Sequence, residues 1–185
     1  MPSSSWKHIS PTIEKIWDIS PKSVLDIGIG FGKWGFLLRE YLEIGQGRYN
    51  KSEWRIKIDG IEIFEPYILE THRFLYDQIF IGDVQKVIDD VSNYDLIIVG
   101  DILEHLPKDE AVALIEKIIK KGKKIIINIP LGLWPQEEVF NNPHEEHISS
   151  WCIEDFEAYD VVSKEVFHWI DGSELLLIEI KGLHF

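Results

Sequence analysis

Short segments rich in β-branched residues alternate along this chain with segments whose apolar residues recur at helical spacing. The first such segment, residues 23–27, is followed by a glycine-rich turn and then by a helical pattern over residues 34–42. Strands that alternate with helices form parallel sheets, because each helix returns the chain across the sheet before the next strand begins. The alternation therefore predicts an α/β fold built on a parallel sheet.

The same two patterns predict most of the other elements. Further strands are expected at residues 56–63, 79–81, 96–99 and 124–129, and further helices at residues 66–75 and 111–119. An N-terminal helix is expected to begin at a Ser10-Pro11 cap and to be docked by Trp6 and Trp17.

The pattern changes after residue 130. Residues 131–148 are predicted to form a long loop, which in compact domains is usually a lid or a binding element. A short helix is expected over residues 151–159, and then a hairpin of residues 161–170 and 174–180 around an Asp-Gly tip.

Composition and charge limit the class of protein. The 185 residues are 45% hydrophobic and 28% charged, as in a soluble globular domain with a real core. The net charge of −13 would repel nucleic-acid phosphates in the absence of a local basic patch. The single cysteine, Cys152, excludes an internal disulfide. The first residues lack the apolar run that is expected of a signal peptide, and no apolar stretch reaches about 20 residues. We expect a cytoplasmic protein with neither a nucleic-acid nor a membrane partner.

The turn after the first strand indicates the kind of ligand. Residues 26–35 read Asp-Ile-Gly-Ile-Gly-Phe-Gly-Lys-Trp-Gly, and glycines at alternate positions let the backbone turn tightly and let a ligand approach it. Gly30, Gly32 and Gly35 match the dinucleotide-binding spacing G-x-G-x-x-G. Asp26 with Gly28, Gly30 and Gly32 instead forms D-x-G-x-G-x-G, and a plain turn is the third reading.

Charge favours a cationic ligand over a dinucleotide. Four acids follow predicted strands, and in a parallel sheet they converge on one edge: Asp26, Glu62, Asp83 and Asp101. A pyrophosphate would be repelled there, and Lys33 is the only cation nearby. S-adenosylmethionine carries a sulfonium and an ammonium and has no phosphate.

With these motifs the sequence resembles the class I S-adenosylmethionine-dependent methyltransferases from about residue 22 to the C-terminus. The resemblance implies a Rossmann-like fold, with a seven-stranded, mostly parallel sheet, helices on both faces and a C-terminal antiparallel hairpin. It also implies one domain over residues 1–185, in which residues 1–21 form a helical cover and residues 22–185 form the core.

The resemblance also assigns cofactor-binding residues. The methionine part would be held by Asp26 and the glycine turn, and the remaining contacts would come from the ends of later strands: Gly28, Gly30 and Gly32 in the turn, Glu62 and Ile63 at the ribose, Asp83 and Val84 at the adenine, and Asp101 beside the transferred methyl group. Simpler roles stay open. Asp83 could only cap a helix, Glu62 could be a solvated charge, and Asp26 is expected both to accept backbone hydrogen bonds from the turn and to touch the ligand.

Candidate catalytic residues follow the fourth predicted strand and lie in the long loop. Asp101, Glu104, His105 and His147 are candidate bases for an acceptor that must lose a proton. Their pattern is similar to the metal site of the small-RNA 3′-terminal 2′-O-methyltransferases, in which two acids and two histidines hold a divalent ion. That family usually has glutamate where this chain has Asp101, and the same run occurs in metal-free relatives.

The resulting hypothesis is a methyltransferase acting on an oxygen or nitrogen of a small-molecule acceptor. Trp134, Phe140 and Trp151 are expected to line the acceptor pocket. S-adenosylmethionine is expected without a metal; a divalent ion held by the four candidate catalytic residues is the alternative. A non-catalytic cofactor-binding protein and an NAD-dependent oxidoreductase are the rival functions, and the oligomeric state is left open.

Overall fold

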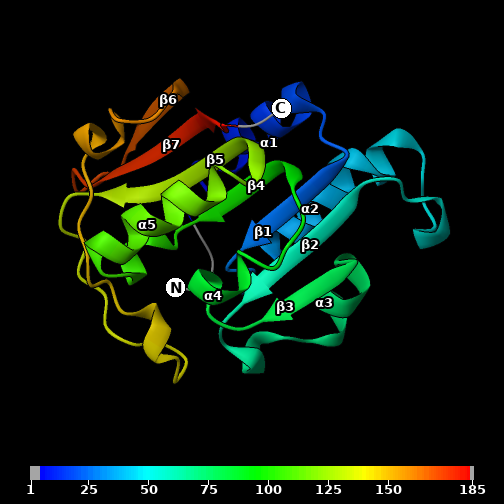
Figure 1. Cartoon of the computed structure of the whole chain (residues 1–185), viewed down its shortest axis with the longest axis horizontal. Coiled ribbons are helices and arrows are strands. Elements are labelled where there is room, and N and C mark those ends of the chain that lie inside the picture. The colour runs from blue at the N-terminus through cyan, green and yellow to red at the C-terminus, as the bar shows by residue number, and fades with distance from the viewer. Residues whose placement is uncertain (1–4, 184–185) are drawn as a thin grey trace.

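The computed structural model describes residues 5–183, whose strands form one seven-stranded sheet in the order β3-β2-β1-β4-β5-β7-β6 (Figure 1). The strands are β1 (Ser23–Ile27), β2 (Lys57–Glu62), β3 (Gln78–Ile81), β4 (Tyr94–Gly100), β5 (Gly122–Leu131), β6 (Val161–His168) and β7 (Glu174–Lys181). β1 to β5 run parallel, whereas β7 runs antiparallel to both β5 and β6. The predicted α/β fold with its C-terminal antiparallel hairpin is confirmed. Residues 1–4 and 184–185 of the expected domain lie outside the described residues.

Helices cover both faces of the sheet, as predicted. The α-helices are α1 (Ile9–Ile19), α2 (Lys33–Leu42), α3 (Glu70–Leu75), α4 (Val84–Val87) and α5 (Lys108–Ile118). Short 3-10 helices connect them: η1 (Ile44–Gln46), η2 (Lys51–Glu53), η3 (Glu65–Tyr67), η4 (Leu103–His105), η5 (Pro143–Glu145) and η6 (Ile153–Phe156). α4 and α5 pack on one face of the sheet, and α1, α2 and α3 pack on the other (Figure 1). Among the described residues, every helix is too short or too polar to cross a membrane.

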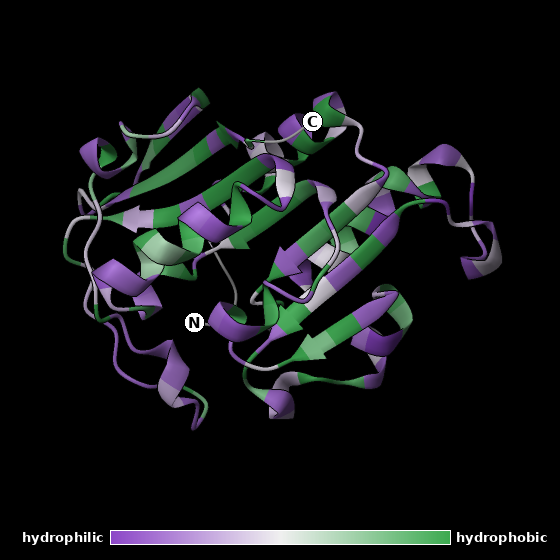
Figure 2. Ribbon diagram, viewed as in Figure 1, coloured by the Kyte–Doolittle hydropathy of each residue, from purple (hydrophilic) through white to green (hydrophobic). Residues whose placement is uncertain are grey.

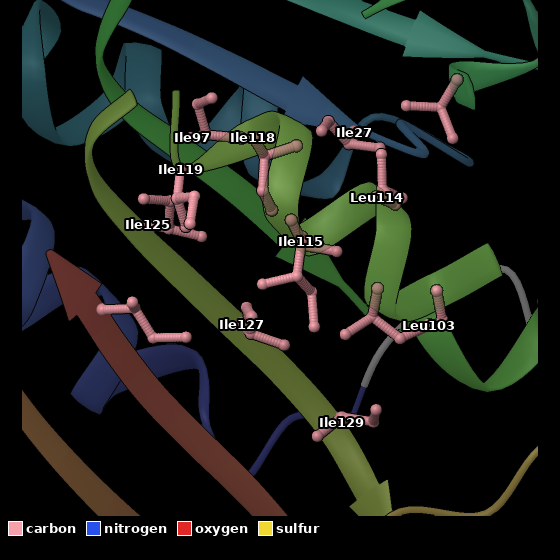
Figure 3. Packing of buried hydrophobic residues seen from close by; sticks show 14 of the residues in the cluster. Ile27, Ile97, Leu103, Leu114, Ile115, Ile118, Ile119, Ile125, Ile127 and Ile129 are labelled. Atoms are coloured by element: carbon pink, nitrogen blue, oxygen red, sulfur yellow. The ribbon is translucent and has the colours of Figure 1, made fainter. Parts of the chain in front are cut away.

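The core consists of two apolar layers, one on each side of the central strands. On the α5 side, Ile97, Ile125 and Ile127 of the sheet pack against the buried face of the helix, which carries Leu114 and Ile118 (Figure 3). Figure 2 shows β4 and β5 mostly in the apolar colour, which is expected for strands buried on both faces.

The N-terminal helix is anchored differently from the prediction. Ile13 and Ile16 of α1 are buried against the sheet, whereas Trp17 is 52% exposed and lies outside this apolar cluster. Trp6 is also exposed and lies edge-to-face on Trp169 of the β6–β7 hairpin. The helix begins at Ile9, with His8 rather than Ser10 at its N-cap position. The expected Ser10 cap and Trp17 anchor are therefore wrong.

Two other predicted helices are shorter than expected. Pro66 lies in the 3-10 helix η3, and the extended backbone of Leu69 separates it from α3. Within residues 151–159 only η6 is helical.

The parallel strands place their carboxyl ends along one edge of the sheet. The glycine turn follows β1 at this edge, Glu62 is the last residue of β2, and Asp101 follows β4. The segment of residues 132–148 (hereafter the 132–148 loop) leaves β5 at the same edge and carries η5 (Figure 1). This edge is therefore where the predicted site residues come together.

Candidate functional site

A pocket opens at the carboxyl edge of the sheet, between the ends of β1, β2 and β4 and the 132–148 loop. Its polar and aromatic lining includes Lys33, Trp34, Glu62, Tyr67, Asp83, Asp101, His105, Asn142, His144 and Glu145. Gly28, Gly30, Ile63 and Val84 line it as well. The structure thus brings together most of the predicted cofactor residues, and Asp26 and Gly32 are the ones that do not line the pocket.

The backbone of the turn is left-handed at three positions, and this explains why glycines occupy them. Gly28, Gly30 and Gly32 have φ values of 72°, 51° and 83°, a region that side chains other than glycine adopt rarely. A Cβ on Gly28 would also collide with the side chain of Ile102. The alternate glycines are therefore required by the path of the chain, and they leave the backbone of the turn open to the pocket.

Glu62 fastens the turn to the end of β2. Its Oε2 accepts a 2.9 Å hydrogen bond from the backbone N–H of Gly30, and its Oε1 accepts one of 2.9 Å from Phe64. Burial raises the pKa of this carboxyl, and the two backbone hydrogen bonds oppose that shift. Glu62 is thus a buried group of the pocket wall, not a solvated loop charge.

Asp26 lies beneath the turn. It is fully buried, and its Oδ2 accepts a 2.6 Å hydrogen bond from the hydroxyl of Tyr76. The backbone hydrogen bond from the turn that was expected at Asp26 is accepted by Glu62 instead. Burial raises the pKa of Asp26 to about 7, although the Tyr76 hydrogen bond and the charge of Lys33 lower it.

Asp83 combines the two roles considered for it. Its Oδ1 accepts a 2.9 Å hydrogen bond from the backbone N–H of Gln85 and so caps α4, and its side chain also lines the pocket next to Val84. The cap holds the carboxylate at the pocket wall.

Lys33 brings a buried ammonium group to the inner end of the pocket. Its Nζ is inaccessible to water and has no hydrogen-bond partner among residues 5–183; it lies 4.7 Å from the centre of the Trp34 ring. Burial lowers its pKa to about 8, and the nearby charges of Asp101 and Asp26 oppose the shift. A buried cation without a hydrogen-bonding partner is costly, so this position favours a ligand that offers an acceptor.

Asp101 and His8 adjoin this lysine. Asp101 has a left-handed φ of 54°, and its Oδ2 lies 3.9 Å from Nε2 of the buried His8. Burial, reinforced by the charge of Lys33, lowers the pKa of His8 to about 3. His8 is therefore neutral at pH 7.

Glu104, His105 and His147 form a compact group beside the pocket, with one potential ligand atom from each within 4.8 Å of the others. Among the described residues, neither carboxylate oxygen of the buried Glu104 has a hydrogen-bond partner. Asp101, the fourth residue of the predicted set, is not part of this group.

Backbone carbonyls determine the protonation of both histidines. Nδ1 of His105 lies 3.0 Å from the carbonyl oxygen of Glu146, and Nδ1 of His147 lies 2.7 Å from that of Trp134. A carbonyl only accepts hydrogen bonds, so each Nδ1 carries the proton and each neutral ring keeps a lone pair on Nε2. Burial lowers the pKa of His105 to about 4 and lowers that of His147 as well, which favours these neutral forms. The group can therefore act as a base or hold a divalent ion.

The three aromatic residues predicted to line the acceptor pocket do not line the pocket at the sheet edge. Trp151 is buried in the core, stacked on Phe156, so its assignment to the pocket is wrong. Trp134 contributes its carbonyl group to His147, and Phe140 is exposed at the pocket mouth, edge-to-face with Phe31. Neither side chain lines the pocket.

Sequence reasoning assigned no site role to six polar or aromatic residues that line the pocket: Lys33, Trp34, Tyr67, Asn142, His144 and Glu145. The run Asn-Pro-His-Glu-Glu-His at residues 142–147 was a signal for three of them, because it concentrates polar and ionisable residues in a long loop. Tyr67 carried no such signal, since an aromatic residue near a proline reads equally well as packing.

Solved structures share this fold across almost the whole chain. The methyltransferase domain of bacterial-CtHen1-C is similar over 96% of this chain and 98% of its own, with a TM-score of 0.63 and 18% identity. The N-terminal domain of EvdMO1, determined with SAH (S-adenosylhomocysteine) bound, is similar over 97% and 83%, with a TM-score of 0.66 and 15% identity. This is the class I methyltransferase fold.

A third methyltransferase-fold neighbour is TehB from Haemophilus influenzae, with a TM-score of 0.64 and 13% identity over 97% of this chain and 64% of its own. No family model matches the sequence. No curated protein matches it either. The likeness therefore concerns the methyltransferase fold, and function is argued from the site.

Proposed function

We propose that this chain is an S-adenosylmethionine-dependent methyltransferase that acts on an oxygen or nitrogen of a small-molecule acceptor. The observation that carries the proposal is the convergence of an open glycine turn with Glu62, Asp83 and Asp101 around one pocket of the class I methyltransferase fold. This surrounding of acids suits a cationic methyl donor and opposes the pyrophosphate of a dinucleotide.

The residues present fit the cofactor. Lys33, whose buried ammonium group lacks a hydrogen-bond partner, would hold the carboxylate of the methionine part, and Asp101 would hold its ammonium group. Each oxygen of Glu62 accepts one backbone hydrogen bond and keeps a lone pair for the ribose hydroxyls. Asp83 would accept from the adenine amino group.

When bound, S-adenosylmethionine supplies a methyl group activated by its sulfonium. The residues of this chain would hold that group in a pocket bordered by the 132–148 loop, and this would align the reactants and exclude water. Burial, strengthened by the charge of Asp101, raises the pKa of Glu104 well above its usual value. Glu104 thus holds a proton more firmly than an exposed glutamate, and in its ionised form it would be the stronger base toward an acceptor hydroxyl or amine.

A specific observation supports a second form of this function, a metal-assisted O-methyltransferase. Glu104, His105 and His147 each bring one possible ligand atom within 4.8 Å of the others, and both rings are oriented by backbone carbonyls. Mixed carboxylate and imidazole ligands suit manganese or zinc as well as magnesium. Because the net charge of −13 disfavours RNA, a small-molecule hydroxyl is the acceptor that we expect here too.

Calorimetry with SAH, followed by incubation with labelled S-adenosylmethionine and panels of alcohols and amines, tests the proposal. Binding of SAH with labelled product supports it. Binding without product on any panel would favour a non-catalytic cofactor-binding protein, and stabilisation by NADH without any effect of SAH would favour an oxidoreductase. Loss of turnover in a chelator, restored by Mn²⁺, would select the metal-assisted form.

A further inference from the structure

The segment of residues 142–149 connects two parts of the site that the sequence keeps apart. At its start, Asn142, His144 and Glu145 line the cofactor pocket. At its end, the backbone N–H groups of Ile148 and Ser149 donate hydrogen bonds of 2.9 and 3.1 Å to the carbonyl oxygen of Glu104. One short stretch of chain thus contacts both the cofactor half and the Glu104–His105–His147 group.

A tight turn holds the tip of the 132–148 loop against the glycine turn. Phe140 and Asn141 both have a left-handed φ, of 56° and 55°, and the N–H of Asn142 donates to the carbonyl oxygen of Val139 at 3.0 Å. Two consecutive residues with positive φ are unfavourable unless both are glycine or asparagine, so the position of Phe140 needs compensation. The contact of its ring with the ring of Phe31, at a centroid distance of 5.9 Å, provides this compensation.

Tyr67 holds the middle of this segment. Its hydroxyl donates a 3.1 Å hydrogen bond to Oε1 of Glu145, which also accepts from Nδ2 of Asn142 at 3.4 Å. Glu145 is buried, and its charge acts on Glu62 at the pocket wall. The contact therefore joins η3, which follows the cofactor strand β2, to the loop that follows β5.

The residues directly after Glu145 support both histidines. Glu146 offers its carbonyl oxygen to Nδ1 of His105 at 3.0 Å, and the N–H of His147 donates to the carbonyl oxygen of Gln136 at 3.0 Å. Nε2 of Gln136 returns a 2.6 Å hydrogen bond to the carbonyl oxygen of Glu145. A displacement of Glu145 would therefore move His147 and the support of His105 together.

We propose that Tyr67 is a positioning residue that acts through Glu145, so that a ligand in the cofactor pocket stabilises the 132–148 loop and, with it, the arrangement of the Glu104–His105–His147 group. This inference rests on the proposed function, because it needs a ligand in the pocket. It goes further by making the loop the link between cofactor binding and the acceptor-facing residues.

Hydrogen exchange of the purified full-length protein with and without saturating SAH tests the link. In the wild type, SAH should slow exchange of the amides of residues 146–149, which lie beyond the pocket lining, by about tenfold or more. Tyr67→Phe keeps the ring contacts with Phe31 and Phe64 and removes only the hydroxyl. At saturating SAH it should lose most of this protection, and the affinity for SAH should fall by about two- to tenfold.

Conservative and control variants separate positioning from a general loss of structure. Glu145→Gln keeps an oxygen that accepts from Tyr67 and should retain the protection, whereas Glu145→Ala should lose it. Tyr159→Phe removes the hydroxyl of another partly buried tyrosine, which packs at the edge of the core, and should behave as the wild type.

Each outcome decides a separate question. If the wild type does not bind SAH, the proposed function is wrong and this inference falls with it. If SAH binds and protects only the glycine turn and η3, the proposed function stands and the link to the histidines is wrong. Equal protection by SAH in the wild type, Tyr67→Phe and Glu145→Ala would show that the ligand stabilises the loop without the Tyr67–Glu145 hydrogen bond, and the inference would be wrong.

Discussion

The hydroxyl of Tyr76 donates a 2.6 Å hydrogen bond to Oδ2 of Asp26 and accepts one of 3.1 Å from the backbone N–H of Gly35. Tyr76 ends α3, Asp26 belongs to β1 and Gly35 lies in the first turn of α2, so one side chain joins the three elements that surround the glycine turn. All three residues are buried. Asp26 therefore supports the glycine turn from beneath, and it does so without lining the cofactor pocket.

Asp26→Asn should make the stability of the free protein less dependent on pH. Burial raises the pKa of Asp26 from 3.8 to about 7, so the folded protein binds this proton more tightly than the unfolded chain does, and stability falls as the pH rises from about 4 through about 7. Asparagine keeps an acceptor for Tyr76 and carries no charge. The difference in the free energy of unfolding between Asp26→Asn and the wild type should therefore shift in favour of the variant by roughly 2–4 kcal/mol from pH 4 to pH 8, at about 1.36 kcal/mol per pKa unit.

Urea denaturation at a series of pH values measures this effect. Asp90→Asn, at an exposed position, is the matched control and should follow the wild type. Parallel pH profiles for the wild type and Asp26→Asn would show that Asp26 is not the group responsible.

Glu62→Ala should weaken SAH binding by about 1–3 kcal/mol, because the turn loses its acceptor for Gly30 and the ligand loses a charge-assisted hydrogen bond. Calorimetry would show a dissociation constant higher by about five- to a hundredfold. Glu70→Ala removes an almost fully exposed acid from the start of α3 and should leave affinity unchanged. The same affinity in Glu62→Ala and the wild type would remove Glu62 from the site.

Gly60→Ala should destabilise the fold by about 1–3 kcal/mol, the usual effect of overpacking a core. Gly60 lies in β2, and a Cβ there would come within 2.5 Å of Cγ2 of Ile29 and 3.1 Å of the Tyr76 ring. Both neighbours belong to the support of the glycine turn, so SAH affinity should fall as well. Thermal and urea unfolding measure the stability, and an unchanged midpoint would contradict the packing described for this strand.

Trp151→Ala should cost about 3–5 kcal/mol of stability, as expected for a buried tryptophan. Its ring stacks on Phe156, lies under Nζ of Lys108 at 3.6 Å and donates through Nε1 to Ser149. Denaturant unfolding measures the loss. A stable variant with altered acceptor preference would instead return Trp151 to the acceptor pocket.

The sheet and its acidic edge were predictable because both depend on local pattern. A buried strand such as residues 96–99 is recognised from its own residues, and parallel strands place Glu62 and Asp101 at the same edge whatever the details of packing. The backbone conformation of the glycine turn follows in the same way from its three alternate glycines.

The pairings across long sequence separations were not predictable. Asp26 meets Tyr76 and Tyr67 meets Glu145 at separations of 50 and 78 residues, and no periodicity within one segment reports such a pair. Trp151 illustrates a second limit: a large aromatic residue after a loop suits a core as well as a pocket, and only the presence of Phe156 beneath it decides. The predicted cap of α1 was wrong for a related reason. Ser10 lies inside the helix because the helix begins one residue earlier, at Ile9.

His147→Ala should lower turnover more than SAH affinity, because the residue belongs to the Glu104–His105–His147 group and does not line the pocket. If the group holds an ion, the variant should also bind Mn²⁺ or Zn²⁺ at least tenfold more weakly, since a three-residue site loses one of its ligands. Calorimetric titration with each ion and with SAH separates the two effects. His168→Ala, an exposed histidine of the β6–β7 hairpin, is the matched control.

The pattern across these titrations distinguishes the two forms of the proposed function. A base requires a free lone pair on Nε2 and no metal, so His147→Ala would then lower turnover while the wild type ignores chelators and binds no ion. A metal site requires all three groups together, so His105→Ala, His147→Ala and Glu104→Gln should each lower the affinity for the ion. Wild-type turnover in both histidine variants would exclude both roles, and the carbonyl contacts of the two rings would then serve only to hold the 132–148 loop against η4.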